Sequence, residues 1–164
     1  MSRVDLVYSI IQKNPGIRFN DVMRLSKLKN GTLTHYISKL EDTKMINVER
    51  TPRITRFFDI DISEKEAMIC KQLTLPTIKN IIVLLLNEGT LTFPQIREKV
   101  EKSPATVSVC LSRLFKSGIV EKTYDIPSNK YTLKNPTLIK GVLKVYFPDR
   151  YSKIVNNTIE LLDF

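Results

Sequence analysis

The sequence predicts a mainly α-helical fold with small β-hairpins, an α+β class in which one order of elements occurs twice along 164 residues. The first observation is that apolar side chains recur at helical spacing over residues 30–41, so that one face of this helix is buried. The second is a hairpin pattern over residues 45–60, directly after that helix. The third is that both patterns return about 74 positions later, which indicates a tandem repeat.

The first 41 residues are predicted to form three helices and one β-bridge, and the third of these helices is the one at residues 30–41. Apolar residues place the first helix at residues 2–13, and residues 17–19 are too short for more than a single β-bridge. Asn20 suits the N-cap of a second helix that runs to about Ser26 and packs through Val22 and Leu25. A tight turn joins it to the third helix. Two short helices joined in this way form a helix-turn-helix, and the hairpin that follows completes a winged-helix domain.

The second half of the chain repeats this order with its own helix starts and hairpin. Thr92 begins a capping pattern, and Ser103 before Pro104 begins the counterpart of the third helix. Because element order and core positions both recur, the sequence predicts two tandem winged helix-turn-helix domains plus a C-terminal helix. The predicted boundaries are residues 1–73 for the first domain, 74–148 for the second and 149–164 for the C-terminal amphipathic helix.

Composition narrows the function. The chain has 26 basic and 17 acidic residues, a formal charge of +9, which favours an anionic partner such as nucleic acid. Its cysteines are Cys70 and Cys110 and its one histidine is His35, so no zinc site can be assembled from them. No phosphate loop or catalytic motif occurs, and we expect neither an enzyme nor a bound cofactor. The longest apolar run is too short to span a membrane, and we expect a soluble, cytoplasmic protein.

Double-stranded DNA is the predicted partner. The polar face of the helix at residues 30–41 carries the donors and acceptors that reach base edges and phosphates in a major groove. Strand alternation places Arg56 opposite Phe57, so one side of the first hairpin packs while the other stays basic. The candidate DNA contacts of the first domain are Lys27, Lys29, Asn30, Thr32, Thr34, His35, Ser38, Lys39, Arg50, Arg53 and Arg56. Those of the second domain are Ser103, Thr106, Ser108, Ser112, Arg113, Lys116, Lys122, Asn129 and Lys130.

The terminal helix carries a sustained apolar stripe. Its members recur at helical spacing, and those proposed for dimerisation are Tyr151, Ile154, Val155, Ile159 and Leu162. Regulators commonly bind two half-sites as symmetric dimers, so we expect this stripe to form a homodimer interface. The alternative is that the stripe closes the core of the second domain.

Two interpretations of the polar surfaces stay open. One is a DNA-binding transcriptional regulator that uses both domains. The other is a protein-interaction subunit of a larger complex, since tandem winged helices also build general transcription machinery and ESCRT-type assemblies. Charge does not separate them, because residues 1–73 carry +4 and residues 74–164 carry +5. Val109 can meet a thymine methyl group or, equally, a protein partner.

Several motifs carry a family resemblance. The first copy resembles archaeal winged-helix regulators in Asn-Pro-Gly-Ile at 14–17, Gly-Thr-Leu at 31–33, His-Tyr-Ile at 35–37, Lys-Leu-Glu at 39–41 and Arg-Phe-Phe at 56–58. The second copy is similar to MarR/ArsR-type regulators in Ser-Pro-Ala-Thr-Val-Ser at 103–108 and Ser-Gly-Ile-Val at 117–120. Lys44 stands where the second copy has Gly118, and a left-handed backbone there costs lysine roughly 1 kcal/mol more than glycine. The resemblance implies DNA binding and transcriptional control, and it names no operator or effector.

Overall fold

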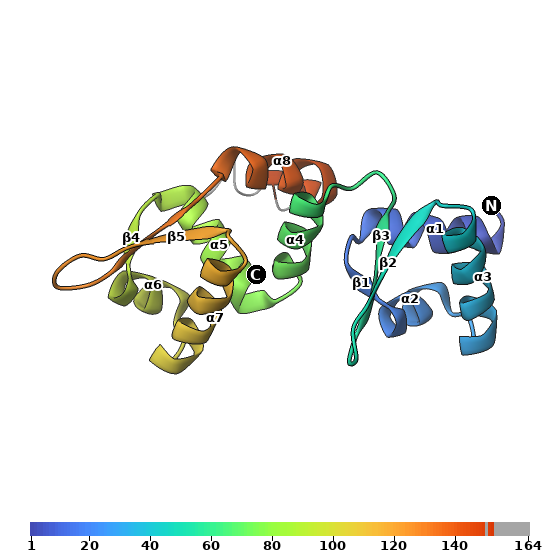
Figure 1. Ribbon diagram of the computed structural model, residues 1–164, viewed down its shortest axis with the longest axis horizontal. Coiled ribbons are helices and arrows are strands. Elements are labelled where there is room, and N and C mark those ends of the chain that lie inside the picture. Colours follow the sequence, from blue (N-terminus) through green and yellow to red (C-terminus); the bar gives the residue numbers. More distant parts are fainter. Residues whose placement is uncertain (150, 153–164) are drawn as a thin grey trace. The chain divides into compact units, whose positions relative to one another are not determined.

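Figure 1 shows the computed structural model, which describes residues 1–149, 151 and 152. The chain forms two compact units, one from Met1 to Ala67 and one that begins at Met68. The division lies inside helix α4 (Glu64–Leu73), whereas the sequence places a boundary after residue 73. The three predicted domain ranges stay a prediction. Each unit is described by itself below.

The first unit contains three complete helices, the start of α4 and a small sheet. Its helices are α1 (Arg3–Lys13), α2 (Phe19–Ser26) and α3 (Asn30–Asp42), and its strands are β1 (Ile17–Arg18), β2 (Ile46–Arg50) and β3 (Thr55–Asp59). β3 is the central strand of an antiparallel sheet with the order β1-β3-β2. Ile17 pairs with Phe57 and Arg18 pairs with Arg56, so the segment predicted as a single bridge is a two-residue strand.

The core of this unit lies where the three helices meet the sheet. In α3 the buried residues fall at helical spacing on one face, as the sequence predicts, and α1 contributes a matching stripe. The buried cluster consists of Val7, Ile11, Ile17, Val22, Leu33, Ile37, Leu40, Ile46 and Phe57. With one face held in this core, the opposite face of α3 is turned outward.

Two details of α2 differ from the prediction. The helix begins at Phe19, so Asn20 lies inside the first turn and is not the N-cap. The reason is that pairing with β3 keeps the chain extended up to the preceding residue, after which it becomes helical at once. Leu25 is 45% exposed, and the buried position at the end of the helix is Ser26. Ser26 follows Val22 by four residues and therefore shares its core-facing side.

The second unit repeats the first in its order of elements. It contains the end of α4, then α5 (Pro76–Glu88), β4 (Leu91–Thr92), α6 (Phe93–Val100), α7 (Pro104–Lys116), β5 (Val120–Thr123), β6 (Lys130–Leu133) and α8 (Pro136–Tyr146). Its sheet order, β4-β6-β5, matches β1-β3-β2. Thr92 and Gln95 form a complete capping box, and the Ser103 side chain caps α7, so both predicted helix starts are confirmed.

Each unit therefore holds a helix-turn-helix followed by a hairpin wing, and the predicted fold class is confirmed. The buried face of α7 consists of Val107, Leu111 and Leu114, as predicted. Of the residues proposed for dimerisation, Tyr151 is described, and its backbone N–H donates to the Phe147 carbonyl at 3.0 Å. The other four, Ile154, Val155, Ile159 and Leu162, lie outside the described residues.

The residue just before each wing has a left-handed backbone. Lys44 has φ 58° and Gly118 has φ 77°. A Cβ added at Gly118 meets nothing within 4 Å, so this position makes a demand on the backbone alone. The left-handed conformation anticipated for Lys44 is thus present in the structure.

Replacing Lys44 with glycine should stabilise the protein. We expect the free energy of unfolding to rise by up to about 1 kcal/mol, because glycine adopts positive φ without a steric penalty, while its greater unfolded-state entropy offsets part of the gain. The converse variant, Gly118→Ala, should lose about 1 kcal/mol. Urea unfolding followed by circular dichroism measures both. A Lys44→Gly variant that is less stable than the parent would contradict the expectation.

Candidate nucleic-acid interface

The outward face of α3 is polar and solvent-exposed. The predicted contacts on this face are all exposed, namely Thr34, His35, Ser38 and Lys39. The Thr34 hydroxyl donates to the Asn30 backbone carbonyl at 2.8 Å, and its oxygen keeps lone pairs that can accept from a base. Because the opposite face is locked in the core, these side chains form one continuous surface on a helix that can enter a major groove.

The start of α3 is electropositive. Lys27 and Lys29 are exposed at the end of α2 and at the N-cap of α3. No acidic residue lies in the first turn of α3, where the helix dipole places partial positive charge. Asn30 is exposed and Thr32 is half-buried beside it. Backbone N–H groups and lysines together suit a phosphate here.

The arginines of the first wing lie in three different environments, and the prediction for Arg56 is wrong. Arg56 is 6% exposed, and its Nη1 donates to the Gly16 carbonyl at 2.9 Å. Successive residues of β3 do alternate in direction, but Arg56, Phe57 and Phe58 are all buried, so both faces of the strand are covered here. Arg50 is exposed and makes two 2.8 Å hydrogen bonds to the carboxylate of Glu41. Arg53 lies exposed in the turn between the strands and fits a phosphate contact.

The pair of Arg50 and Glu41 joins the wing to the end of α3. The hydrogen bonds from Arg50 hold the pKa of Glu41 below its ordinary value of 4.5, and those same bonds raise the pKa of Arg50. Their side chains are 59% and 35% exposed, so solvent screens much of the attraction. The pair therefore positions the wing more than it stabilises the fold.

A double-mutant cycle with Glu41→Gln and Arg50→Gln should show this modest coupling. We expect about 0.2–1 kcal/mol at neutral pH. Since the folded-state pKa of Glu41 is lowered, its contribution is complete above pH 4.5 and is lost as the pH falls through the folded value. Chemical unfolding of the four proteins at neutral and acid pH tests the sign. A coupling that grows on acidification would be inconsistent with it.

In the second unit, α7 also presents its predicted contacts outward. Ser103, Thr106, Ser108, Ser112, Arg113 and Lys116 are all exposed. The Ser103 hydroxyl is engaged at the start of the helix, where it accepts from the Thr106 N–H at 3.2 Å. Val109 is 68% exposed on the same face. The positive charge of this face comes from Arg113 and Lys116 and lies toward the end of the helix.

The two predicted lysines of the second wing have partners within the wing. Lys130 Nζ lies 3.1 Å from Asp125 Oδ2, and hydrogen bonding to Lys130 lowers the pKa of that carboxyl. Lys122 Nζ lies 4.9 Å from the centroid of the Tyr124 ring. Asn129, the residue before β6, is half-buried. These side chains shape the wing and are only partly available to phosphate.

Sequence reasoning missed the exposed apolar tip of this wing. Tyr124 is 77% exposed and Ile126 is 93% exposed. Loops are usually polar, so an aromatic and a β-branched residue between two strands were a signal in the sequence that could have indicated a contact surface. Apolar side chains such as that of isoleucine are known to insert between base steps in a minor groove.

Other chemistry has little support in the described part of the chain. There, no group of three or more His, Cys, Asp and Glu side chains is placed to hold a metal ion. Cys70 is buried, while Cys110 is half-buried, and burial raises the pKa of the Cys110 thiol. Over residues 1–149, 151 and 152, no helix alone has the length and apolar content of a membrane span; α4 and α5 reach both only as a pair bent by 112°.

Known families match both units. Residues 2–47 match a family described as winged helix-turn-helix DNA-binding, and residues 77–122 match the arsR family of bacterial regulatory proteins. These matches support a DNA-binding transcriptional regulator. Each match includes a complete helix-turn-helix and ends within the first strand of the wing hairpin. The alternative, a subunit of a larger protein complex, has no support from them.

A solved structure also resembles part of the chain. It is the transcriptional repressor BigR from Xylella fastidiosa, with 26% identity over 50% of this chain and 83% of that one, at a TM-score of 0.45. A search of curated proteins finds no match. The archaeal and MarR-type kinship stays a prediction.

Proposed function

We propose that this regulator binds double-stranded DNA by laying α3 of the first unit and α7 of the second in major grooves. The observation that carries the proposal is the outward face of α3, which is polar and exposed along its length while the other face is fixed in the core. A rigidly held helix with a polar, basic face is what direct readout of base edges requires.

The exposed side chains divide into two roles. Thr34, His35 and Ser38 offer the short polar groups that read base edges. Lys39, at the end of α3, and Arg53, in the first wing, offer the charges that hold phosphates and fix the register. On α7, Ser108, Ser112, Arg113 and Lys116 would repeat this division. Arg50 and Arg56 act through Glu41 and Gly16 and shape the wing.

The experiment is selection from a random duplex pool, followed by fluorescence anisotropy of the full-length chain on the selected duplex across a salt series. We expect a preferred sequence and a linear fall of log K with log salt, with a slope near −0.9 for each phosphate contacted. No enrichment, with equal affinity for all duplexes, would overturn sequence-specific regulation by α3 and α7.

We also propose that the protein is a homodimer through residues 149–164. The support is the apolar stripe in the sequence together with the preference of regulators for paired half-sites. Sedimentation of the intact protein tests this, and a monomer at tens of micromolar, roughly the range of weak dimers, argues against it. If these residues form the dimer interface, their removal should leave a folded monomer that binds DNA more weakly.

A further inference from the structure

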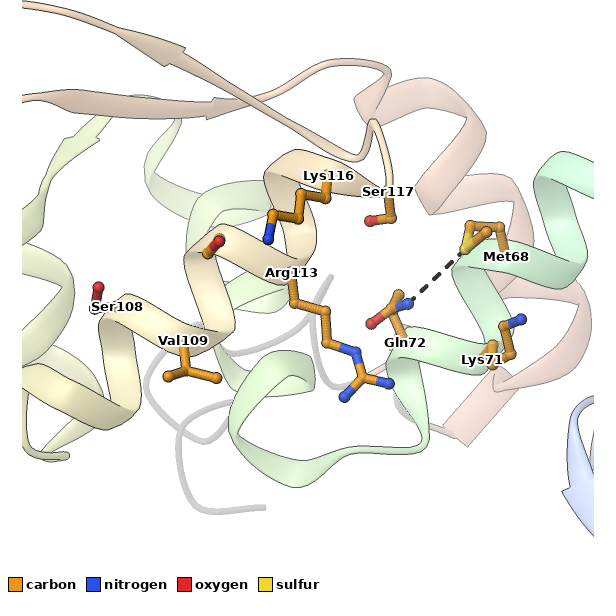
Figure 2. Close-up of a pocket in the computed structure, with 9 residues that line it drawn as sticks. Met68, Lys71, Gln72, Ser108, Val109, Arg113, Lys116 and Ser117 are labelled. Carbon is orange, nitrogen blue, oxygen red and sulfur yellow. Dashed lines mark hydrogen bonds between the residues drawn. The ribbon is translucent and has the colours of Figure 1, made fainter. Parts of the chain in front are cut away.

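The second unit holds a pocket of about 750 Å³ on the face of α7 that carries the proposed DNA contacts. Figure 2 shows α7 on one side of this pocket and the end of α4 on the other. The volume lies within the usual range for small-molecule sites, roughly 300–1,000 Å³. The pocket is therefore large enough for an organic ligand.

Gln72, which lines this pocket, is a buried polar residue whose side-chain oxygen accepts no hydrogen bond from the described residues. It lies on α4 and is only 4% exposed. Its Nε2 donates to Met68 Sδ at 3.8 Å, and among the described residues none donates a hydrogen bond to its Oε1. Figure 2 shows the Gln72 amide reaching from α4 into the space beside Arg113. A buried acceptor without a hydrogen-bond donor is unfavourable. A ligand that donates a hydrogen bond to Oε1 would remove this cost.

The charges in the pocket select the class of ligand. Of the described residues that line it, Lys71, Arg113 and Lys116 are basic and none is acidic. Met68 and Val109 add apolar surface. Cations beside apolar surface and one buried acceptor fit a compact organic anion that has an apolar body and a hydrogen-bond donor.

We propose that this pocket binds a small organic anion of that kind and that the bound ligand competes with DNA for α7. The competition rests on the proposed function, because Arg113 and Lys116 line the pocket and are also proposed DNA contacts. A bound anion would occupy their charges and add a negative charge that repels phosphate. By linkage, DNA must weaken ligand binding by the same factor. The pocket would make the second unit the regulated one.

The test uses 8-anilinonaphthalene-1-sulfonate, which has a sulfonate, an aromatic body and one N–H donor. We expect one saturable fluorescent site per chain, with an affinity that falls at least fivefold in Gln72→Leu and in the volume-conserving Gln72→Met. Gln12→Leu is the matched control, since Gln12 is an exposed amide in α1. In thermal unfolding, Gln72→Leu should be no less stable than the parent protein, because it removes the unpaired acceptor. If both Gln72 variants bound the probe as tightly as the parent protein does, the proposed ligand site would be overturned.

The second arm adds the selected duplex. In the parent protein, saturating probe should raise the dissociation constant for DNA at least fivefold, and in Gln72→Leu it should not. Gln72-dependent probe binding with unchanged DNA affinity would overturn the competition. Failure of the unliganded protein to bind any duplex would instead count against the proposed function, while the probe titration would still decide the pocket.

Discussion

An Arg56→Met variant should lose about 1.5–3 kcal/mol of its free energy of unfolding, which is a large fraction of the total stability of a small domain. The Arg56 guanidinium is buried and donates to the Gly16 carbonyl, which is buried as well. Methionine fills a similar volume but cannot donate, so the carbonyl would be left without this partner. Urea unfolding followed by circular dichroism measures the loss.

Arg53→Met is the matched control, with the same change of side chain and charge in the same wing. Arg53 is exposed, so its unfolding free energy should change by less than about 0.5 kcal/mol. The effects on DNA should be reversed: Arg53→Met should reduce the salt slope by about 0.9, and Arg56→Met, measured where it is folded, should leave it unchanged. A destabilised Arg53→Met beside a stable Arg56→Met would show that the two roles are assigned the wrong way round.

The helices were predictable because their apolar residues recur with a helical period over three turns. In α3 and α7 the buried positions are those that periodicity predicts, and the cap at Ser103 uses local chemistry that a sequence displays directly. Short elements were harder. α2 has eight residues, too few turns for a period to separate Leu25 from Ser26, and its start is decided by pairing between β1 and β3.

The interface was predictable only where exposure follows from periodicity. Thr34, Ser38 and Lys39 are outward because α3 has one buried face. Arg56 was misassigned because alternation within one strand does not reveal whether a second layer covers the other face. Likewise, Gln72 looks like an ordinary polar residue in the sequence of α4, and its unpaired oxygen is evident only when α7 is placed opposite it.

The double variant Lys39→Gln/Arg113→Gln should lower DNA affinity by roughly 2–4 kcal/mol while leaving the fold intact. Both side chains are exposed in the last turn of their helices, so neither contributes to a core. If each holds one phosphate, the salt slope should become less steep by about 2, and the loss should be similar on specific and unrelated duplexes. Fluorescence anisotropy across a salt series measures both quantities.

Net charge alone could weaken binding, and a second double variant separates this effect from lost contacts. Lys13→Gln/Lys140→Gln also removes two positive charges from the total of +9, but at two other exposed helical positions, in α1 and α8. Its affinity at physiological salt should stay close to that of the parent protein, because screening over about 8 Å removes most of a distant charge's effect. If both double variants lost affinity equally, the positive charge would act as a diffuse field. The assignment of α3 and α7 as the recognition helices would then lose its energetic basis, whereas a loss confined to Lys39 and Arg113 means that DNA lies against these two helices.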